Sequence, residues 1–357
     1  MRLFAIVALV LALSSLIPQS ATDAAFLRNN GKIVFETNRD SNAEIYSMNI
    51  DGGAQTNLTN NVASDVRPEW SPDGSRITFA SDRDGDFEIY VMDADGMNVQ
   101  QLTVNLVSDF QPTWSPSGNQ IAFESDRNPP PAAGSHTEIF AMDANGSNVV
   151  QLTDNAVLDG APSWSPNGST IIFHSNETTR MEIYSMSASG QGRTQLTSNG
   201  HITEYPDWSP DGSMITFDAQ LVSLTDFEIY VMNPNGTNQV AVTNNGVSDG
   251  FPAWSPDGTR IAFMSLPDIH LVDPNGANEV SPKPNNAHID SFPDWQPLAF
   301  IGGIAELPAE GSSTSLSTNN SSRISTGIIT GIVATVASVV ALGGAAWYAK
   351  SRRARAA

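Results

Sequence analysis

Acidic side chains recur at one position of this 357-residue sequence, five places before each of six regularly spaced tryptophans. Five of these positions hold Asp, and the sixth holds Thr203 with Glu204 beside it. The acidic set is Asp65, Asp109, Asp159, Glu204, Asp249 and Asp290. Carboxylates that converge on one opening attract a metal ion, another cation or a Lys- or Arg-bearing peptide. Asp also accepts hydrogen bonds from backbone N–H groups in loops, so a structural role is the competing interpretation.

Arginines recur at a second matched position in three of the repeats, as Arg39, Arg83 and Arg127. Each stands near an acidic residue, and pairing with Asp40, Asp84 and Asp126 would make plain surface ion pairs. Otherwise the arginines give a mixed charge to one half of the face that carries the acidic set. They therefore join the acidic set as candidate ligand-binding residues.

No other pattern indicates catalysis, a metal or a cofactor. The five histidines lack zinc spacing, and there is no nucleophile-elbow or phosphate-loop motif. Residues 82–88 have the composition of a calcium loop, but the glycine stands at the fourth place, which excludes an EF-hand. We therefore expect no enzyme, although paired carboxylates at one opening leave acid–base hydrolysis open as an alternative.

The elements that must position these residues follow from the tryptophan frame. Successive tryptophans are 44, 50, 44, 46 and 41 residues apart, each with Pro two places before and two places after it and Asn nine places before it. The tryptophans are Trp70, Trp114, Trp164, Trp208, Trp254 and Trp295. A period in the mid-forties with short β-rich segments is typical of a β-propeller, with one four-stranded sheet per repeat.

One repeat predicts a whole blade. Strands are expected at 68–71, 77–80, 88–92 and 99–103, separated by Asp- and Gly-rich turns. Residues 31–59 supply the last three strands of a blade, and residues 292–297 supply a first strand with nothing after it. We therefore predict an all-β, six-bladed propeller in which the C-terminal strand joins the N-terminal blade and leaves no open edge.

The repeats resemble those of TolB-type, WD40-like (PD40) propellers over about residues 31–297. The matching motifs are Trp-Ser-Pro-Asp-Gly at 70–74, 208–212 and 254–258, Glu-Ile-Tyr-x-Met at 88–92 and 228–232, and Gln-Leu-Thr at 101–103, 151–153 and 195–197. The resemblance implies a propeller known chiefly as a protein-binding element, and also found as the non-catalytic half of certain peptidases. The chain departs from TolB in lacking its additional N-terminal domain and in carrying a membrane helix, so TolB's partner is not carried over.

Strand directions divide the predicted propeller into two faces. The loops between blades and the hairpins joining the second and third strands of each blade lie on one face, called here the hairpin face. The remaining turns lie on the opposite turn face. Nearly all length variation falls in the hairpins, and the longest spans residues 126–136. Because loops that break the symmetry of a repeated scaffold tend to carry recognition, we expect binding on the hairpin face.

The two ends predict a single-pass membrane protein. We expect a signal peptide at 1–25, the propeller at 26–297 and a Ser/Thr-rich stalk at 298–326. An apolar segment at 327–349 is long enough to cross a bilayer, and the basic tail at 350–357 should stay cytoplasmic. The propeller is then extracellular or periplasmic. Gly327 and Gly331 have the spacing that packs two membrane helices into a dimer.

Composition narrows the partner. The formal net charge is −21, with 38 acidic against 17 basic residues, which argues against nucleic-acid binding and favours a basic protein or peptide. There is no cysteine, so disulfides and thiolate chemistry are excluded. The leading hypothesis is a membrane-anchored binding or scaffold module. One alternative is a hydrolase or hydrolase-accessory propeller that uses the acidic set at the mouth of the central channel. The other is a structural surface-coat protein.

Overall fold

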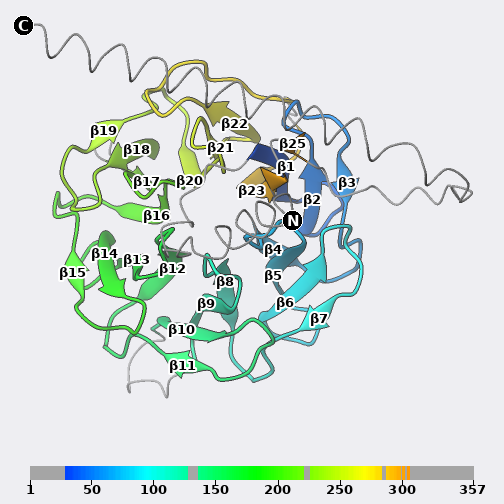
Figure 1. Cartoon of the computed structure of the whole chain (residues 1–357), viewed down its shortest axis with the longest axis horizontal. Helices are drawn as coiled ribbons and strands as arrows, with labels where there is room; N and C mark the ends of the chain where they lie inside the picture. The colour runs from blue at the N-terminus through cyan, green and yellow to red at the C-terminus, as the bar shows by residue number, and fades with distance from the viewer. Residues whose placement is uncertain are drawn as a thin grey trace, which may run out of the picture. The chain divides into compact units, whose positions relative to one another are not determined.

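The computed structural model describes residues 29–127, 136–220, 226–283, 287–298, 300–301 and 304–305. Six β-sheets stand around a common axis, and the innermost strands of all six surround a central channel (Figure 1). The predicted signal peptide, most of the stalk, the membrane segment and the tail lie outside the described residues. In the part of the chain that is described, no helix has the length and apolarity needed to cross a bilayer.

Five blades are four-stranded, ordered from the channel outwards. Blade 1 combines β23 (Asp290–Leu298), β1 (Asn29–Thr37), β2 (Glu44–Met48) and β3 (Thr56–Asn57). Blade 2 is β4 (Asp65–Trp70), β5 (Arg76–Ser81), β6 (Glu88–Asp93) and β7 (Gln100–Gln101). Blade 3 is β8 (Asp109–Trp114), β9 (Gln120–Ser125), β10 (Glu138–Asp143) and β11 (Val150–Gln151).

The remaining blades follow the same order. Blade 4 is β12 (Asp159–Trp164), β13 (Thr170–Ser175), β14 (Glu182–Ser187) and β15 (Thr194–Gln195). Blade 5 is β16 (Thr203–Trp208), β17 (Ile215–Ala219), β18 (Glu228–Met232) and β19 (Val240–Ala241). Blade 6 is β20 (Asp249–Trp254), β21 (Ile261–Ser265) and β22 (Asp268–Val272), with a single bridge from Leu271 to Val280 at its outer edge. A separate pair joins β24 (Phe300–Ile301) to β25 (Ile304–Ala305).

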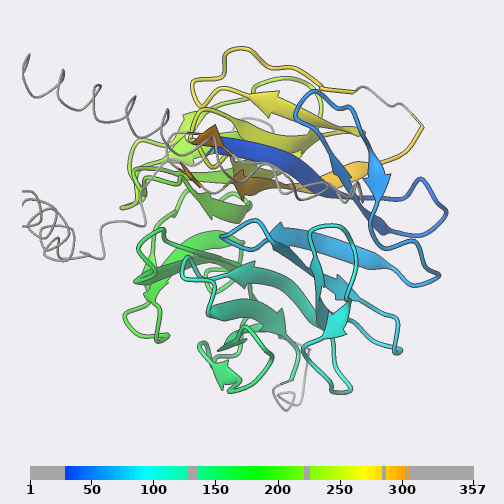
Figure 2. The same cartoon turned by 45° about the vertical axis from the view of Figure 1, so that its right-hand side comes forward.

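The ring closes as the sequence predicts. β23 runs antiparallel to β1, with Trp295 opposite Ile33 and Asp290 opposite Thr37. Both views place β1 beside β23, although the two strands come from opposite ends of the repeat region (Figures 1 and 2). The six-bladed, all-β prediction is therefore confirmed. Closure leaves no inner strand unpaired, which removes the edges on which open sheets aggregate.

The core lies between neighbouring blades rather than within one blade. Each blade buries a phenylalanine of its second strand completely: Phe35, Phe79, Phe123, Phe173, Phe217 and Phe263. A typical cluster joins Val34 and Ile45 of blade 1 to Trp70 and Phe79 of blade 2. Burial of apolar surface at about 25 cal/mol per Å² is the main force that stacks the sheets. The tryptophan of each repeat is therefore an inter-blade core residue, except that Trp208 is only partly buried.

A bulge in every innermost strand positions the channel lining. In all six blades, the residue directly before the proline that stands two places before the tryptophan has a left-handed backbone, with φ between 47° and 56°. These residues are Arg67, Gln111, Ala161, Tyr205, Phe251 and Phe292. In all six blades the pairing register with the second strand shifts across this residue, and blade 1 has a further shift between Asn30 and Ile33. Since a bulge re-aims a side chain, the repeat turns its most variable position towards the channel.

Candidate functional site

The predicted acidic set begins each innermost strand but does not line the channel cavity. Asp65, Asp109, Asp159 and Asp249 are fully buried, Asp290 is 4 % exposed, and Thr203 occupies the same position in blade 5. In four blades an Asn four residues earlier donates through Nδ2 to the Asp carboxylate, at 2.5 to 2.9 Å. These hydrogen bonds fix the loop that leads into each innermost strand. Ligand binding by the acidic set stays a prediction. Glu204 points to the other side of its strand, where burial raises its pKa and the nearby charge of Arg67 lowers it.

The arginines are part of the same network. Arg39 donates twice to Asp290 at 2.9 Å, Arg83 donates to Asp65 at 2.9 Å, and Arg127 donates to Asp109. The expectation that they pair with Asp40, Asp84 and Asp126 was wrong. The innermost Asp is fully buried and lies directly below the hairpin, whereas Asp40 and Asp84 bind the outer side chains Tyr46 and Gln101.

A fourth arginine completes this pattern from a different position. Arg193, the residue before β15, donates to both carboxylate oxygens of Asp159 at 2.6 and 3.0 Å. Its guanidinium stacks on Phe173 and Tyr184, with 5.0 and 4.6 Å to the ring centroids. Sequence reasoning missed Arg193 because it compared only hairpin positions. The signal available was the Asp of blade 4, whose hairpin has Glu177 rather than arginine at the matched position.

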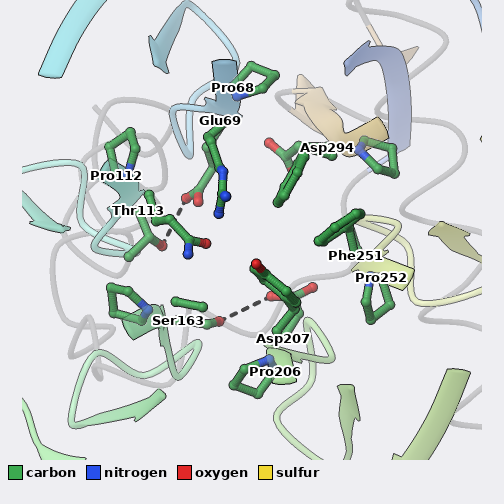
Figure 3. A pocket seen from close by; sticks show the side chains of 18 of the residues that line it. Pro68, Glu69, Pro112, Thr113, Ser163, Pro206, Asp207, Phe251, Pro252 and Asp294 are labelled. Atoms are coloured by element: carbon green, nitrogen blue, oxygen red, sulfur yellow. Dashed lines mark hydrogen bonds between the residues drawn. The ribbon is translucent and has the colours of Figure 1, made fainter. Parts of the chain in front are cut away.

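The channel contains a cavity of about 220 Å³ lined by the x-Pro-x segments of all six innermost strands. Each innermost strand runs from the hairpin face to the turn face, and these segments lie near its middle, on the hairpin-face side of the Trp-x-Pro motifs. Figure 3 shows the side chains of Glu69, Asp207 and Asp294 pointing into it. A second cavity of about 240 Å³, lined by the tryptophans and prolines of the Trp-x-Pro motifs, lies towards the turn face. The three carboxylates border both cavities and so separate them.

Each of these carboxylates also joins two blades. Glu69 Oε1 accepts from the backbone N–H of Trp114 at 2.8 Å and from Thr113 Oγ1 at 3.0 Å. Asp207 accepts from Trp254 N at 2.9 Å and from Ser163 Oγ at 3.1 Å, and Asp294 accepts from Trp70 N at 2.6 Å. The Thr113 and Ser163 bonds are drawn in Figure 3. The carboxylates therefore contribute to blade packing as well as to the charge of the channel.

Burial weakens the acidity of these three carboxyl groups. It raises the pKa of Asp207 to about 6. Burial, followed by the charge of Asp207, raises the pKa of Asp294 to about 7. Burial and then the charge of Asp294 raise the pKa of Glu69 well above its usual range. Asp207 and Asp294 therefore gain or lose protons near neutral pH, and a nearby cation favours the ionised form of all three carboxyl groups.

A second acidic layer lies nearer the hairpin face, in alternate blades. Glu36, Glu124 and Asp218 accept from the backbone N–H of Arg67, Ala161 and Phe251 at 2.9, 3.2 and 3.1 Å. Burial is the largest cause of the raised pKa of all three. Each donor is a left-handed residue of the next blade, so this layer holds the bulges in place. Asp218 keeps one buried oxygen without a hydrogen-bond partner.

Aromatic rings and one arginine complete the lining. Phe251 stacks on Phe292 at 3.8 Å between centroids, and Tyr205 packs edge-on against Phe251 at 4.6 Å. The Arg67 guanidinium lies 4.2 Å from the centre of the Phe292 ring, and its Nη1 has no hydrogen-bond partner. Sequence reasoning missed all four residues. They occupy a position that differs from blade to blade directly before a proline found in every repeat, and that variation was the signal available.

No metal site is evident in the ranges that the structure describes, where no three His, Asp or Glu side chains are grouped as ion ligands. The lining of the channel cavity is partly aromatic and partly acidic. It combines apolar ring faces with carboxylates that can accept a cationic donor.

A model of the TolB β-propeller domain family matches residues 13–204. Among solved structures, TolB from Acinetobacter baumannii is 18 % identical over 75 % of this chain and 67 % of its own, with a TM-score of 0.66. A putative TolB from Agrobacterium tumefaciens is 19 % identical over 75 % of this chain and 99 % of its own, with a TM-score of 0.58. The hydrazine synthase of Kuenenia stuttgartiensis is 14 % identical over 78 % of this chain and 49 % of its own, with a TM-score of 0.63. At these identities the likeness is one of fold, and no curated protein sequence matches the chain.

Proposed function

The chain belongs to the TolB β-propeller family, whose propellers are commonly protein-binding modules, and we propose that it binds a protein or peptide on its hairpin face. The observation that supports the proposal is the channel cavity, where aromatic rings lie on the hairpin-face side of the carboxylates of Glu69, Asp207 and Asp294. A volume of about 220 Å³ suits one inserted side chain or chain end rather than a drug-sized ligand. The surface of this chain around the cavity would make the remaining contacts with the partner.

Charge favours a basic group in the cavity. Arg67 is the only cation among the lining residues, against the carboxylates of Glu69, Asp207 and Asp294. Its charge is already shared with Glu36, Glu124 and Glu204, whose pKa values it lowers. An incoming Lys or Arg side chain would ionise the floor carboxylates and gain charge-assisted hydrogen bonds. This agrees with the acidic composition of the chain.

The rim of the hairpin face offers apolar contacts. The loops between blades expose Val62, Val104, Leu106, Val247 and Ile289, and the last hairpin exposes Leu266. Leu106 is 95 % exposed and Val62 is fully exposed, which is unusual for large apolar side chains with no partner. Their loops follow the outermost strands and lead into the innermost ones, so they surround the cavity mouth. An apolar rim around a polar, concave centre fits a protein partner better than a small molecule.

We also propose the setting in which this binding occurs. Residues 1–25 direct export, residues 327–349 anchor the chain, and the stalk at 298–326 connects the anchor to a propeller outside the cytoplasm. Support comes from the apolar N-terminal run, the uncharged C-terminal segment and the basic residues that follow it. On this proposal the partner is another envelope or surface protein.

Affinity capture from native membrane and envelope extract tests the function, with residues 26–310 as bait. The matched baits are Leu106→Asp on the hairpin face and Met97→Asp in a turn of the opposite face, where Met97 is 63 % exposed. We expect a partner held by the unchanged protein and by Met97→Asp, and lost by Leu106→Asp. Loss with Met97→Asp alone would place recognition on the turn face and contradict the proposal.

Hydrolysis is the second candidate, because Glu69 and Asp294 form a coupled acidic pair with raised pKa values at the cavity floor. Such a pair has the properties of a general acid and base. Turnover of a glycosidic or peptide substrate that disappears in Asp294→Asn would support it. Equal, background-level hydrolysis by the unchanged and Asp294→Asn proteins would leave binding as the function. A structural coat role would be favoured if no bait holds a partner.

A further inference from the structure

Four blades contain the same receptor for a guanidinium group. It consists of the Asp that begins the innermost strand, the Ser or Thr that ends the second strand, and two stacked rings from the second and third strands. In blade 2, Arg83 donates to Asp65 and Ser81 at 2.9 Å and lies 5.4 and 4.5 Å from the ring centroids of Phe79 and Tyr90. Blades 1, 3 and 4 repeat this arrangement with Arg39, Arg127 and Arg193.

Blade 5 has lost both the arginine and its acceptors. Thr203 stands where the other blades have Asp, and its partner across the ladder is Ala219 rather than Ser or Thr. Phe217 and Tyr230 still stack, at 5.7 Å, but no acceptor faces them from those two positions. Blade 5 therefore has neither the arginine nor the Asp and the second-strand hydroxyl that bind it in blades 1 to 4.

Blade 6 keeps the acceptors and has no arginine. Asp249 pairs across the ladder with Ser265, and Phe263 and His270 supply the two rings, 5.8 Å apart. Arginine reaches the receptor from the second residue after the second strand in blades 1 to 3, and from the residue before the fourth strand in blade 4. The corresponding residues of blade 6 are Pro267 and Glu279. Within the described chain, no Lys or Arg is hydrogen-bonded to Asp249 or paired with it.

The carboxylate of Asp249 has no cationic partner among the described residues. The residue is fully buried, Oδ2 accepts from Asn245 at 2.8 Å, and Oδ1 has no hydrogen-bond partner, as is also true of Asp109 Oδ1 in blade 3. Burial raises the pKa of Asp249, hydrogen bonding by Ser265, Thr243 and Asn245 opposes that rise, and the nearby charge of Glu279 adds to it. Glu279 lies at the edge of the receptor and contacts His270 Nδ1 at 2.8 Å. Two acidic groups therefore meet at a position where each filled blade places a cation.

We propose that blade 6 receives a guanidinium from outside the propeller, supplied by an arginine side chain of the partner bound on the hairpin face. The partner's existence rests on the proposed function, whereas the receptor itself does not. The filled receptors reach the surface, since their arginines are 14 to 27 % exposed. Arginine is specified over lysine because the receptor combines a carboxylate, a hydroxyl and two neighbouring rings, which suit a planar fork of donors.

The test uses the full chain in detergent micelles and histidine side-chain NMR, with His270 assigned through a His270→Asn variant. The probes are N-acetylarginine amide and N-acetyllysine amide. We expect saturable shifts of His270 with the arginine compound and at least about tenfold weaker binding of the lysine compound. Asp249→Asn should weaken the arginine response about tenfold or more, through loss of the charged acceptor. Equal responses to both probes, or none from the unchanged protein, would overturn the proposal.

Two further variants guard against indirect effects. Glu279→Arg copies the position of Arg193, so we expect it to fill the receptor, abolish the probe response and raise Tm by about 2–4 °C. Gln239→Arg is the matched control in blade 5, where Thr203 and Ala219 offer no carboxylate and no second-strand hydroxyl, and should neither raise Tm nor change the response. A response that persists in Glu279→Arg would contradict the assignment. Leu106→Asp separates the two proposals, since it should lose the protein partner and retain the arginine probe.

Discussion

Replacing Arg83 with Met tests whether the buried Asp–Arg pairs hold the blades together. Asp65 is completely buried, and Arg83, whose side chain is 27 % exposed, is its only cationic partner among the described residues. The substitution keeps most of the apolar stem and removes the charge, so that a buried carboxylate is left with Asn61 alone. Breaking a buried pair in this way costs about 3–5 kcal/mol.

We expect Arg83→Met to lower the free energy of unfolding by about 3 kcal/mol, the low end of that range, because Arg83 is partly solvated. Its stacking on Tyr90 at 4.5 Å contributes roughly 0.5–1 kcal/mol of this loss. Urea unfolding followed by circular dichroism measures the change as a shift of the midpoint at constant slope. Arg260→Met is the matched control, because the Arg260–Asp273 pair is similarly short at 3.0 Å but its acid is 26 % exposed, whereas Asp65 is fully buried. It should cost less than about 1 kcal/mol.

Another blade of the same chain indicates which second substitution completes a double-mutant cycle with Arg83→Met. Blade 5 folds with Thr203 in place of Asp, so Asp65→Thr combined with Arg83→Met should recover at least about 1 kcal/mol of the loss, because the unpaired charge is gone. A double variant as unstable as Arg83→Met, or an Arg83→Met cost equal to that of Arg260→Met, would refute the reasoning.

Two more predictions concern stability. The folded protein raises the pKa of Asp294 from 3.8 to about 7, so its contribution to stability is full below pH 3.8 and is lost as pH rises through about 7. Unfolding free energies across this range should therefore fall less steeply in Asp294→Asn than in the unchanged protein, and parallel profiles would contradict the assignment. Gly74 has φ +70°, and an added Cβ would lie 2.3 Å from the carbonyl oxygen of Pro297 in the closing strand. Gly74→Ala should lower the free energy of unfolding in urea by roughly 2 kcal/mol or more. Gly246→Ala, which has open space around it, should change that free energy by no more than about 0.5 kcal/mol. Equal costs would show that closure does not depend on this turn.

The fold was readable from the sequence because its signals repeat. The Trp and Pro positions, the Asp-Gly turns and the incomplete first and last repeats each follow from local backbone chemistry, and together they require six blades and a shared closing blade. The acidic partner of each arginine was harder to predict from the sequence. A long side chain reaches several acids, and only the structure shows that Arg83 turns inwards to Asp65 rather than staying beside Asp84.

The channel lining was hidden for a different reason. Alternation along a strand predicts which side chains share a face, but a left-handed residue at Arg67 and its equivalents resets that alternation. Nothing in the residue types Arg, Gln, Ala, Tyr and Phe indicates a bulge. The raised pKa values of Glu69 and Asp294 likewise depend on carboxylates from blades far apart in sequence. Sequence reasoning therefore identified the face and its acidity but not the groups inside the channel.

Hydrogen–deuterium exchange of the propeller, free and with its captured partner, tests the central claim most directly. The account predicts added protection in the loops between blades, at residues 60–64, 104–108 and 244–248, and little change in the turns at 94–98 and 144–148. Protection confined to those turns, with the loops between blades unchanged, would contradict binding on the hairpin face.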